Sequence, residues 1–319
     1  MASPSAAGND ASAASAAAGS AAALTSRRAL GDALAKSSAG AGDSGAQRAL
    51  VAIDRDGFVI PPLRRYAGQA AAYSALGLLG TIGFYTLAAG DPLVMALSLV
   101  GTAAWGHGIL VTHWLERASA LMLRGDLDGA ELLLRRCLRP PWGSEAVRAQ
   151  AHLRLSTLHS RRGEHRQAQE SAEVAVRLFS AEYPPQPQFV QLSRYQEIRS
   201  LINVGKQADA RFRFEEMDAL PLGDFLRAQH YLTELYIALV DDRLPLLDAA
   251  LWERSELALR TPSAEPLIAL CAWGFSQLGE RATSRDLLSL AQQRIREPLD
   301  RTLPFLHRWI ESVREAWHL

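Results

Sequence analysis

Residues 67–113 contain a single charged side chain, Asp91, although 21% of the 319 residues in the chain are charged. Asp91 separates two uncharged segments, 67–90 and 92–112. A helix rises about 1.5 Å per residue, so each segment would be about 30–36 Å long as a helix, which is enough to cross the hydrocarbon core of a bilayer. The stretch therefore predicts a transmembrane helical hairpin over 67–113, with both flanks on the same side of the membrane.

The arginines that flank this stretch predict its orientation. Arg64 and Arg65 precede the first segment, Arg117 and Arg124 follow the second, and the loop between the segments contains neither Lys nor Arg. Lys and Arg are enriched in cytoplasmic flanks, so both termini are expected in the cytoplasm. The Arg- and Ala-rich composition is typical of a GC-rich genome. The expected location is a bacterial inner membrane, with an organellar membrane as the alternative. Two buried core helices of a soluble protein would need partners that cover every face.

Small residues follow one face of the first segment. These residues are Ala70, Ser74, Gly77 and Thr81. Small side chains let neighbouring helices approach closely, so we expect this face to pack on the second segment at Gly101 and Gly106. Homo-oligomerisation through the same face is the alternative.

The residues before the hairpin have a different composition. Residues 1–48 are rich in Ala, Ser and Gly and are predicted to form a disordered tail, because they offer too little apolar area to offset the entropy lost on ordering. An organellar transit peptide is the alternative interpretation of this tail. Residues 49–66 form a juxtamembrane segment, in which two β-branched runs around an Asp-Gly turn predict a short β-hairpin at 50–60.

A periodic pattern begins at residue 114. Its anchors are Gly125, Gly163, Gly205, Asp242 in a degenerate copy, and Gly279, spaced 38, 42, 37 and 37 residues apart. Each glycine is followed five residues later by a small residue, namely Ala130, Ala168, Ala210 or Ser284. Repeats of this length are typical of stacked helical hairpins, each of which buries its apolar face against its neighbours. Glycine suits the end of the first helix of each hairpin, where a left-handed conformation is needed.

This pattern resembles the tetratricopeptide repeat (TPR) family. Trp114, Ala118 and Leu121 occupy positions of the first helix that the family favours for Trp, a small residue and a large residue. The resemblance covers about 114–302 and implies an all-α fold, a solenoid of about five helical hairpins. A final helix over 303–319, with Trp309 and Trp317, is expected to cap it.

The sequence contains no motif that predicts catalysis, a cofactor or a metal. A phosphate-binding glycine-rich loop, a nucleophile elbow and zinc-ligand spacings are absent, so the chain is not expected to be an enzyme. His152 and His159 are seven residues apart, but no Asp, Glu or Cys joins them at ligand spacing, and both are predicted to pack. Cys137 and Cys271 are expected to be buried thiols. The 34 basic and 34 acidic residues balance, which argues against nucleic acid as a partner.

The TPR resemblance implies a binding surface for a protein or peptide on the concave face of the repeats. The residues of the first helices that this assignment selects are Gln150, Thr157, Ser160, Arg161, Tyr195, Arg199, Asn203, Tyr236, Trp273 and Gln277. The Lys and Asn pattern with which some members clamp a C-terminal carboxylate is not reproduced. The expected function is a membrane-anchored scaffold. The alternative is a subunit of a membrane transport or secretion assembly, for which Ser98, Thr102 and His107 would supply a polar face in the second segment.

Overall fold

The computed structural model describes residues 62–89, 92–139, 144–182, 186–217, 223–244, 248–295 and 297–317. Within these ranges the regular secondary structure is helical and no strand is present, which confirms the predicted all-α class. The expected tail at 1–48 and the β-hairpin expected at 50–60 lie outside the described residues. The chain divides into two compact units, which meet in the sequence at 216/217 and are described separately.

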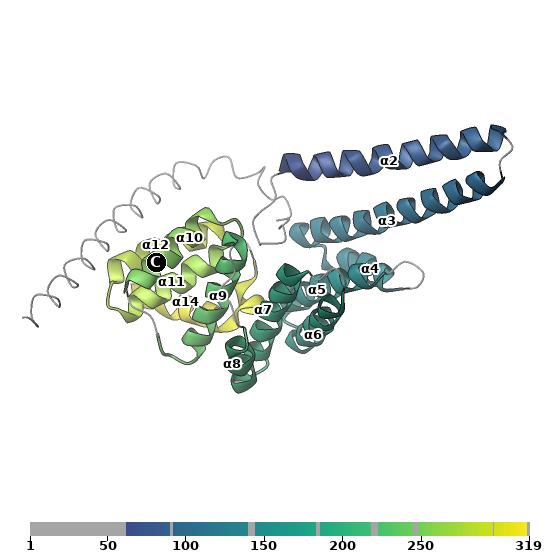
Figure 1. Ribbon diagram of the computed structural model, residues 1–319. Coiled ribbons are helices and arrows are strands. Elements are labelled where there is room, and N and C mark those ends of the chain that lie inside the picture. The colour runs from purple at the N-terminus through teal and green to yellow at the C-terminus, as the bar shows by residue number, and fades with distance from the viewer. Residues whose placement is uncertain are drawn as a thin grey trace, which may run out of the picture. The chain divides into compact units, whose positions relative to one another are not determined.

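The N-terminal unit contains seven helices in its described residues (Figure 1). They are α2 (Pro62–Ala89), α3 (Pro92–Arg124), α4 (Leu127–Leu138), α5 (Glu145–Arg162), α6 (His165–Ala181), α7 (Pro187–Asn203) and α8 (Gln207–Glu215). Each helix packs against the next one along the chain. α2 and α3 lie side by side and antiparallel, and one end of this pair extends away from the other helices of the unit.

The contact between α2 and α3 differs from the predicted one. Gly83 is buried against Ser98, and a Cβ atom built on Gly83 would lie 3.2 Å from the Ser98 Cβ. The expected contact between Gly77 and Gly101 is not formed, because no described atom lies within 4 Å of a Cβ built on either. The face of Ala70, Ser74, Gly77 and Thr81 is exposed. Gly83 follows Gly77 by six residues, about 120° around the helix, so α2 turns a different face to α3.

α3 joins two environments in one unbroken helix of 33 residues. Its first part exposes large apolar side chains such as Leu93, Leu97 and Val100, whereas its last part buries Val111 and Leu115 in the core formed with α4 and α5. The boundary expected at 113/114, between the second apolar segment and the first repeat, therefore falls inside a single helix. Within the described residues, α3 is the one helix that is long and apolar enough to cross a membrane.

Five turns of the same geometry end α3, α5, α7, α9 and α11. The anchor residue has a positive φ in each, at Gly125 (85°), Gly163 (79°), Gly205 (85°), Asp242 (49°) and Gly279 (80°). The N–H of the following residue donates to a carbonyl five residues earlier, as from Asp126 to Leu121 (3.0 Å) and from Glu280 to Phe275 (2.9 Å). This pattern is a Schellman turn, in which a left-handed residue closes the helix end. The predicted anchor positions are confirmed, including the degenerate one at Asp242.

Small residues pack where paired helices meet. The residues five positions after the four glycines are fully buried, and so are those seven positions before them. They are Ala130, Ala168, Ala210 and Ser284, and Ala118, Ser156, Ile198 and Ala272; all are small except Ile198. Between α11 and α12, the Ser284 hydroxyl donates to the Ala272 carbonyl at 2.6 Å. That bond requires close approach of the two backbones, as the small residues predict.

The C-terminal unit contains α9 (Asp224–Val240), α10 (Asp248–Arg260), α11 (Glu265–Gln277), α12 (Arg281–Arg294), α13 (Leu299–Thr302) and α14 (Pro304–Trp317) among its described residues. α11 packs against α9, α10, α12 and α14 and forms its centre. The helix expected at 303–319 is present as α14, which buries Leu306 and Ile310. Phe305 of α14 packs edge-on against Tyr236 of α9, with ring centroids 6.2 Å apart.

The repeated turn predicts opposite effects for two substitutions. Gly205→Ala is expected to lower the free energy of unfolding by about 1 kcal/mol, because an L-residue is strained at a positive φ, although the space around a Cβ at this position is open. Asp242→Gly relieves the same strain and is expected to raise the free energy of unfolding by up to about 1 kcal/mol. Denaturant unfolding of the purified protein, followed by circular dichroism, measures both. Equal, small effects of the two substitutions would contradict the turn geometry.

Candidate functional site

Five of the expected binding residues lie on two helices of the N-terminal unit that contact each other. α5 contributes Gln150, Thr157 and Arg161, and α7 contributes Arg199 and Asn203. All five are half-buried. Amide, hydroxyl and guanidinium groups can donate hydrogen bonds to peptide carbonyls and carboxylates. These five residues are called the candidate face below.

Three residues of the candidate face already have partners in the structure, and two of these contacts join different helices. Arg161 Nη1 donates to the carbonyl of Met122 at 2.8 Å and so satisfies the C-terminal end of α3. Asn203 Nδ2 lies 3.4 Å from Nδ1 of His165, which connects α7 to α6. Arg199 Nη2 donates to Gln196 Oε1 at 3.1 Å within α7. Arg161 therefore has a structural role that is independent of any partner.

The three aromatic residues of the expected site are buried, which corrects the assignment from the sequence. Tyr195, Tyr236 and Trp273 are at most 1% exposed, so their rings are unavailable to a partner in this structure. Burial also raises the pKa of the Tyr195 hydroxyl. Ser160 is buried too, whereas Gln277 is exposed at the end of α11 in the C-terminal unit.

The burial of Trp273 has a cause that is visible in the sequence. Every residue of α11 from Pro266 to Phe275 is buried, and none of them is charged. A helix that is apolar all round is typical of a position covered on every side. The resemblance to the TPR pattern predicts an exposed face on each first helix. In α11 the neighbouring helices cover every face from Pro266 to Phe275.

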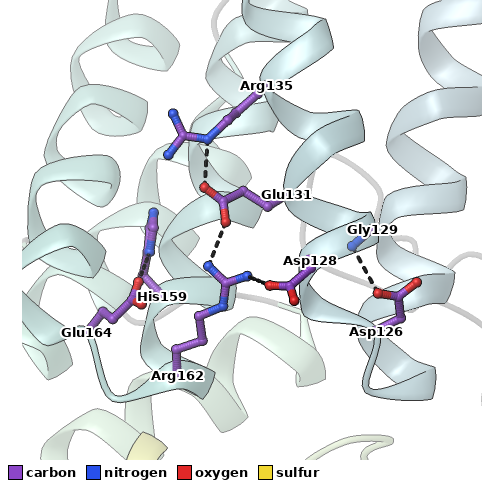
Figure 2. Close-up of polar contacts among 8 residues, drawn as sticks. All are labelled: Asp126, Asp128, Gly129, Glu131, Arg135, His159, Arg162 and Glu164. Carbon is purple, nitrogen blue, oxygen red and sulfur yellow. Dashed lines mark hydrogen bonds and ion pairs between the residues drawn. The ribbon is translucent and has the colours of Figure 1, made fainter.

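An arginine clamp at the turn between α5 and α6 was not anticipated from the sequence (Figure 2). Arg162 Nη1 donates to Glu131 Oε2 at 2.6 Å, and the other terminal nitrogen of Arg162 binds Asp128. Arg135 Nε also donates to Glu131, at 2.6 Å. The hydrogen bond from Arg162 holds the pKa of Glu131 below its usual range. The clamp ties the start of α4 to the end of α5.

His159 and the two cysteines occupy packing positions. His159 Nδ1 contacts Glu164 Oε2 beside the Arg162 clamp (Figure 2). The described residues contain no group of three or more His, Cys, Asp or Glu arranged to hold a metal ion. Cys137 and Cys271 are buried as expected, and burial raises the pKa of Cys271 to about 12, which disfavours the reactive thiolate.

No protein-family model matches the sequence, and neither a curated protein nor a solved structure is significantly similar to it. The likeness to TPR proteins therefore depends on the repeated positions themselves. Those positions are the left-handed anchor residues and the buried small residues that follow the four glycine anchors by five positions.

Three histidines predict that acid destabilises the fold. Burial lowers the pKa of His152, His165 and His230 below the ordinary value of 6.5. These histidines therefore bind protons more readily in the unfolded chain than in the folded one. They do not reduce the free energy of unfolding above about pH 6.5, and they reduce it progressively as the pH falls below that value. We expect a lower unfolding midpoint at about pH 5.5 than at about pH 7.5.

Replacing these histidines is expected to weaken that dependence. The variant His152→Gln, His165→Gln and His230→Gln should lose part of the difference between the two midpoints, whereas His113→Gln, at an exposed position, should retain it. An unchanged pH dependence in the triple variant would show that other groups cause the acid sensitivity.

Proposed function

We propose that this protein is a membrane-anchored scaffold. In this proposal α2 and α3 form a transmembrane hairpin, and the helical hairpins after residue 114 form a TPR-like solenoid that binds a protein or peptide. The observation that supports it best is the change of environment along α3, which is apolar and exposed at one end and part of a folded core at the other.

The surface of α2 and α3 favours lipid over water. Large apolar side chains are exposed along both helices, and these are Tyr73, Leu78, Ile82, Phe84, Tyr85, Leu93, Leu97, Leu99, Val100, Trp105 and Leu110. Exposed apolar area costs roughly 25 cal/mol per Å² in water, and a contiguous patch of this kind is rare on a soluble protein. Only 11% of the most apolar window of α3 is buried, unlike the core helix of a soluble protein.

The hairpin and the first repeats are connected by the unbroken helix α3 and by side-chain hydrogen bonds. Besides the shared core, Arg154 Nε of α5 donates to Ser119 Oγ of α3 at 2.9 Å, and Arg161 of α5 binds the last turn of α3. The helices of the N-terminal unit that pack on α3 would therefore keep one orientation relative to the bilayer instead of moving on a flexible linker. Holding a partner at the membrane in this way raises its local concentration, so a weak binding face is sufficient.

In this proposal both termini lie in the cytoplasm at a bacterial inner membrane, because Lys and Arg are enriched in cytoplasmic flanks. The partner would contact the candidate face through side-chain amides and guanidinium groups. A transport subunit needs a polar face along the spans, and Ser98 is unsuited to it because its side chain lies in the contact with Gly83.

Charged residues in α3 test the membrane span. Val100→Arg with Ala104→Arg places two charges on one exposed face near the middle of the apolar segment, at a cost of about 2.5–3.5 kcal/mol each in a bilayer. We expect this variant to be released from membranes by alkaline extraction, whereas the wild type is retained. The control is Leu123→Arg with Leu132→Arg, two exposed leucines outside the apolar segment, which should be retained. Equal retention of both variants would contradict the span.

Substitutions on the candidate face test partner binding. The variant is Gln150→Ala, Arg199→Ala and Asn203→Ala, and the matched control is Arg281→Ala, Gln292→Ala and Gln293→Ala on the exposed surface of α12. If each truncation costs about 1 kcal/mol of binding free energy, the first variant should bind a captured partner about a hundredfold more weakly. Affinity purification from solubilised membranes measures this. The full chain is required, because a cut at residue 114 would remove Val111 from the core. Equal retention by both variants would show that the partner binds elsewhere.

A further inference from the structure

We infer that one edge of the N-terminal unit is an anionic-lipid binding surface, formed by four exposed arginines that lie where α3 leaves the bilayer. These residues, called the arginine edge, are Arg136 and Arg139 at the end of α4, Arg148 at the start of α5 and Arg177 near the end of α6. The inference rests on the proposed function, since it needs α3 to cross the membrane.

The position of α4 follows from its turn with α3. Gly125 and Asp126 separate the two helices, which pack against each other, so α4 runs antiparallel to α3 and back toward the apolar segment (Figure 1). Cys137 in the last turn of α4 shares a core cluster with Val111 and Leu115 of α3. The uncharged segment of α3 ends at Thr112. The end of α4 is therefore level with the point where α3 would leave the bilayer.

The neighbouring helices bring two more arginines to the same level. α5 runs antiparallel to α4, and α6 runs antiparallel to α5 after the turn at Gly163, so the start of α5 and the end of α6 lie at the edge where α4 ends. Arg148 and Arg177 both lie close to His152. The pKa of His152 is lowered first by burial and then by the charges of these two arginines.

The edge has an excess of positive charge. None of the ion pairs among the described residues includes Arg136, Arg139, Arg148 or Arg177. The acidic residues in the same turns are Glu145 and Glu182, and Glu173 lies one turn earlier in α6.

Carboxylates gather at the other end of the same helices. Asp126, Asp128, Glu131 and Glu164 surround the turns after α3 and α5 (Figure 2). Arg162 pairs with Asp128 and Glu131 at that end, whereas the arginine edge has four arginines in none of the ion pairs among the described residues.

Phospholipid headgroups match this edge in chemistry and in place. Guanidinium groups bind phosphate through paired hydrogen bonds, and an anionic leaflet attracts each nearby arginine enough to shift a binding equilibrium about fivefold. An acidic protein could also bind these arginines, but it would have to displace the lipid headgroups that would already lie next to them. The edge would fix the tilt of the N-terminal unit against the membrane surface, in addition to the connection through α3.

The test uses the full chain in lipid nanodiscs of neutral phosphatidylcholine, with or without anionic phosphatidylglycerol. Amide hydrogen exchange over residues 132–152 is expected to be at least about fivefold slower in the anionic discs. High salt, at about 1 M, should remove this difference because it shortens the screening length to about 3 Å. Exchange over the turns at residues 124–131 and 159–166 is expected to be the same in both discs.

Variants assign the effect to the arginines. Arg136→Gln with Arg139→Gln and Arg148→Gln should abolish the slower exchange. The control variant, Arg166→Gln with Arg281→Gln and Arg285→Gln, removes three exposed arginines elsewhere and should preserve it.

The outcomes separate the inference from the proposed function. Assembly into both discs with identical exchange over 132–152, or slower exchange that persists in the Arg136, Arg139 and Arg148 variant, would overturn the arginine edge and leave the span intact. Failure to assemble into neutral discs would overturn the span and the inference with it.

Discussion

α3 runs without a break from an exposed apolar surface into a packed core, and the other features of the N-terminal unit depend on that continuity. At about 1.5 Å per residue its 33 residues extend for about 50 Å. The helix is unbroken, so whatever orients its apolar half also orients the α4 and α5 helices that share its core. Bonds from Arg154 and Arg161 to the last part of α3 strengthen the same connection.

Local features of this fold could be predicted from the sequence, because they depend on short-range geometry. The anchors at Gly125, Gly163, Gly205 and Gly279 mark left-handed residues that any helix end of this type requires, and Asp242 could be placed by spacing alone. The continuity of α3 also had a local signal, since neither Gly nor Pro occurs from residue 109 to 124. The change in hydropathy and the start of the repeat pattern set the predicted domain boundary at 113/114, but neither change ends the helix.

Long-range contacts could not be predicted in the same way. The clamp between Arg162 and Asp128 joins residues 34 positions apart, and their pairing depends on how α5 stacks on α4. Tyr195, Tyr236 and Trp273 were assigned to a binding face by their position within one helix, yet the neighbouring helices bury them. The candidate face that remains is polar and half-buried, so the proposed binding depends on hydrogen bonds more than on aromatic anchors.

A spin-label scan along α3 tests the central claim most directly. Single labels from Leu93 to Arg124 in lipid bilayers would report their access to oxygen, which concentrates in the hydrocarbon core, and to a water-soluble nickel reagent. The account predicts an unbroken helical period of about 3.6 residues over the whole range, with oxygen access dominant up to about Thr112 and alternating burial and nickel access beyond it. A lost period near residues 113–114, or nickel access along the apolar half, would contradict it.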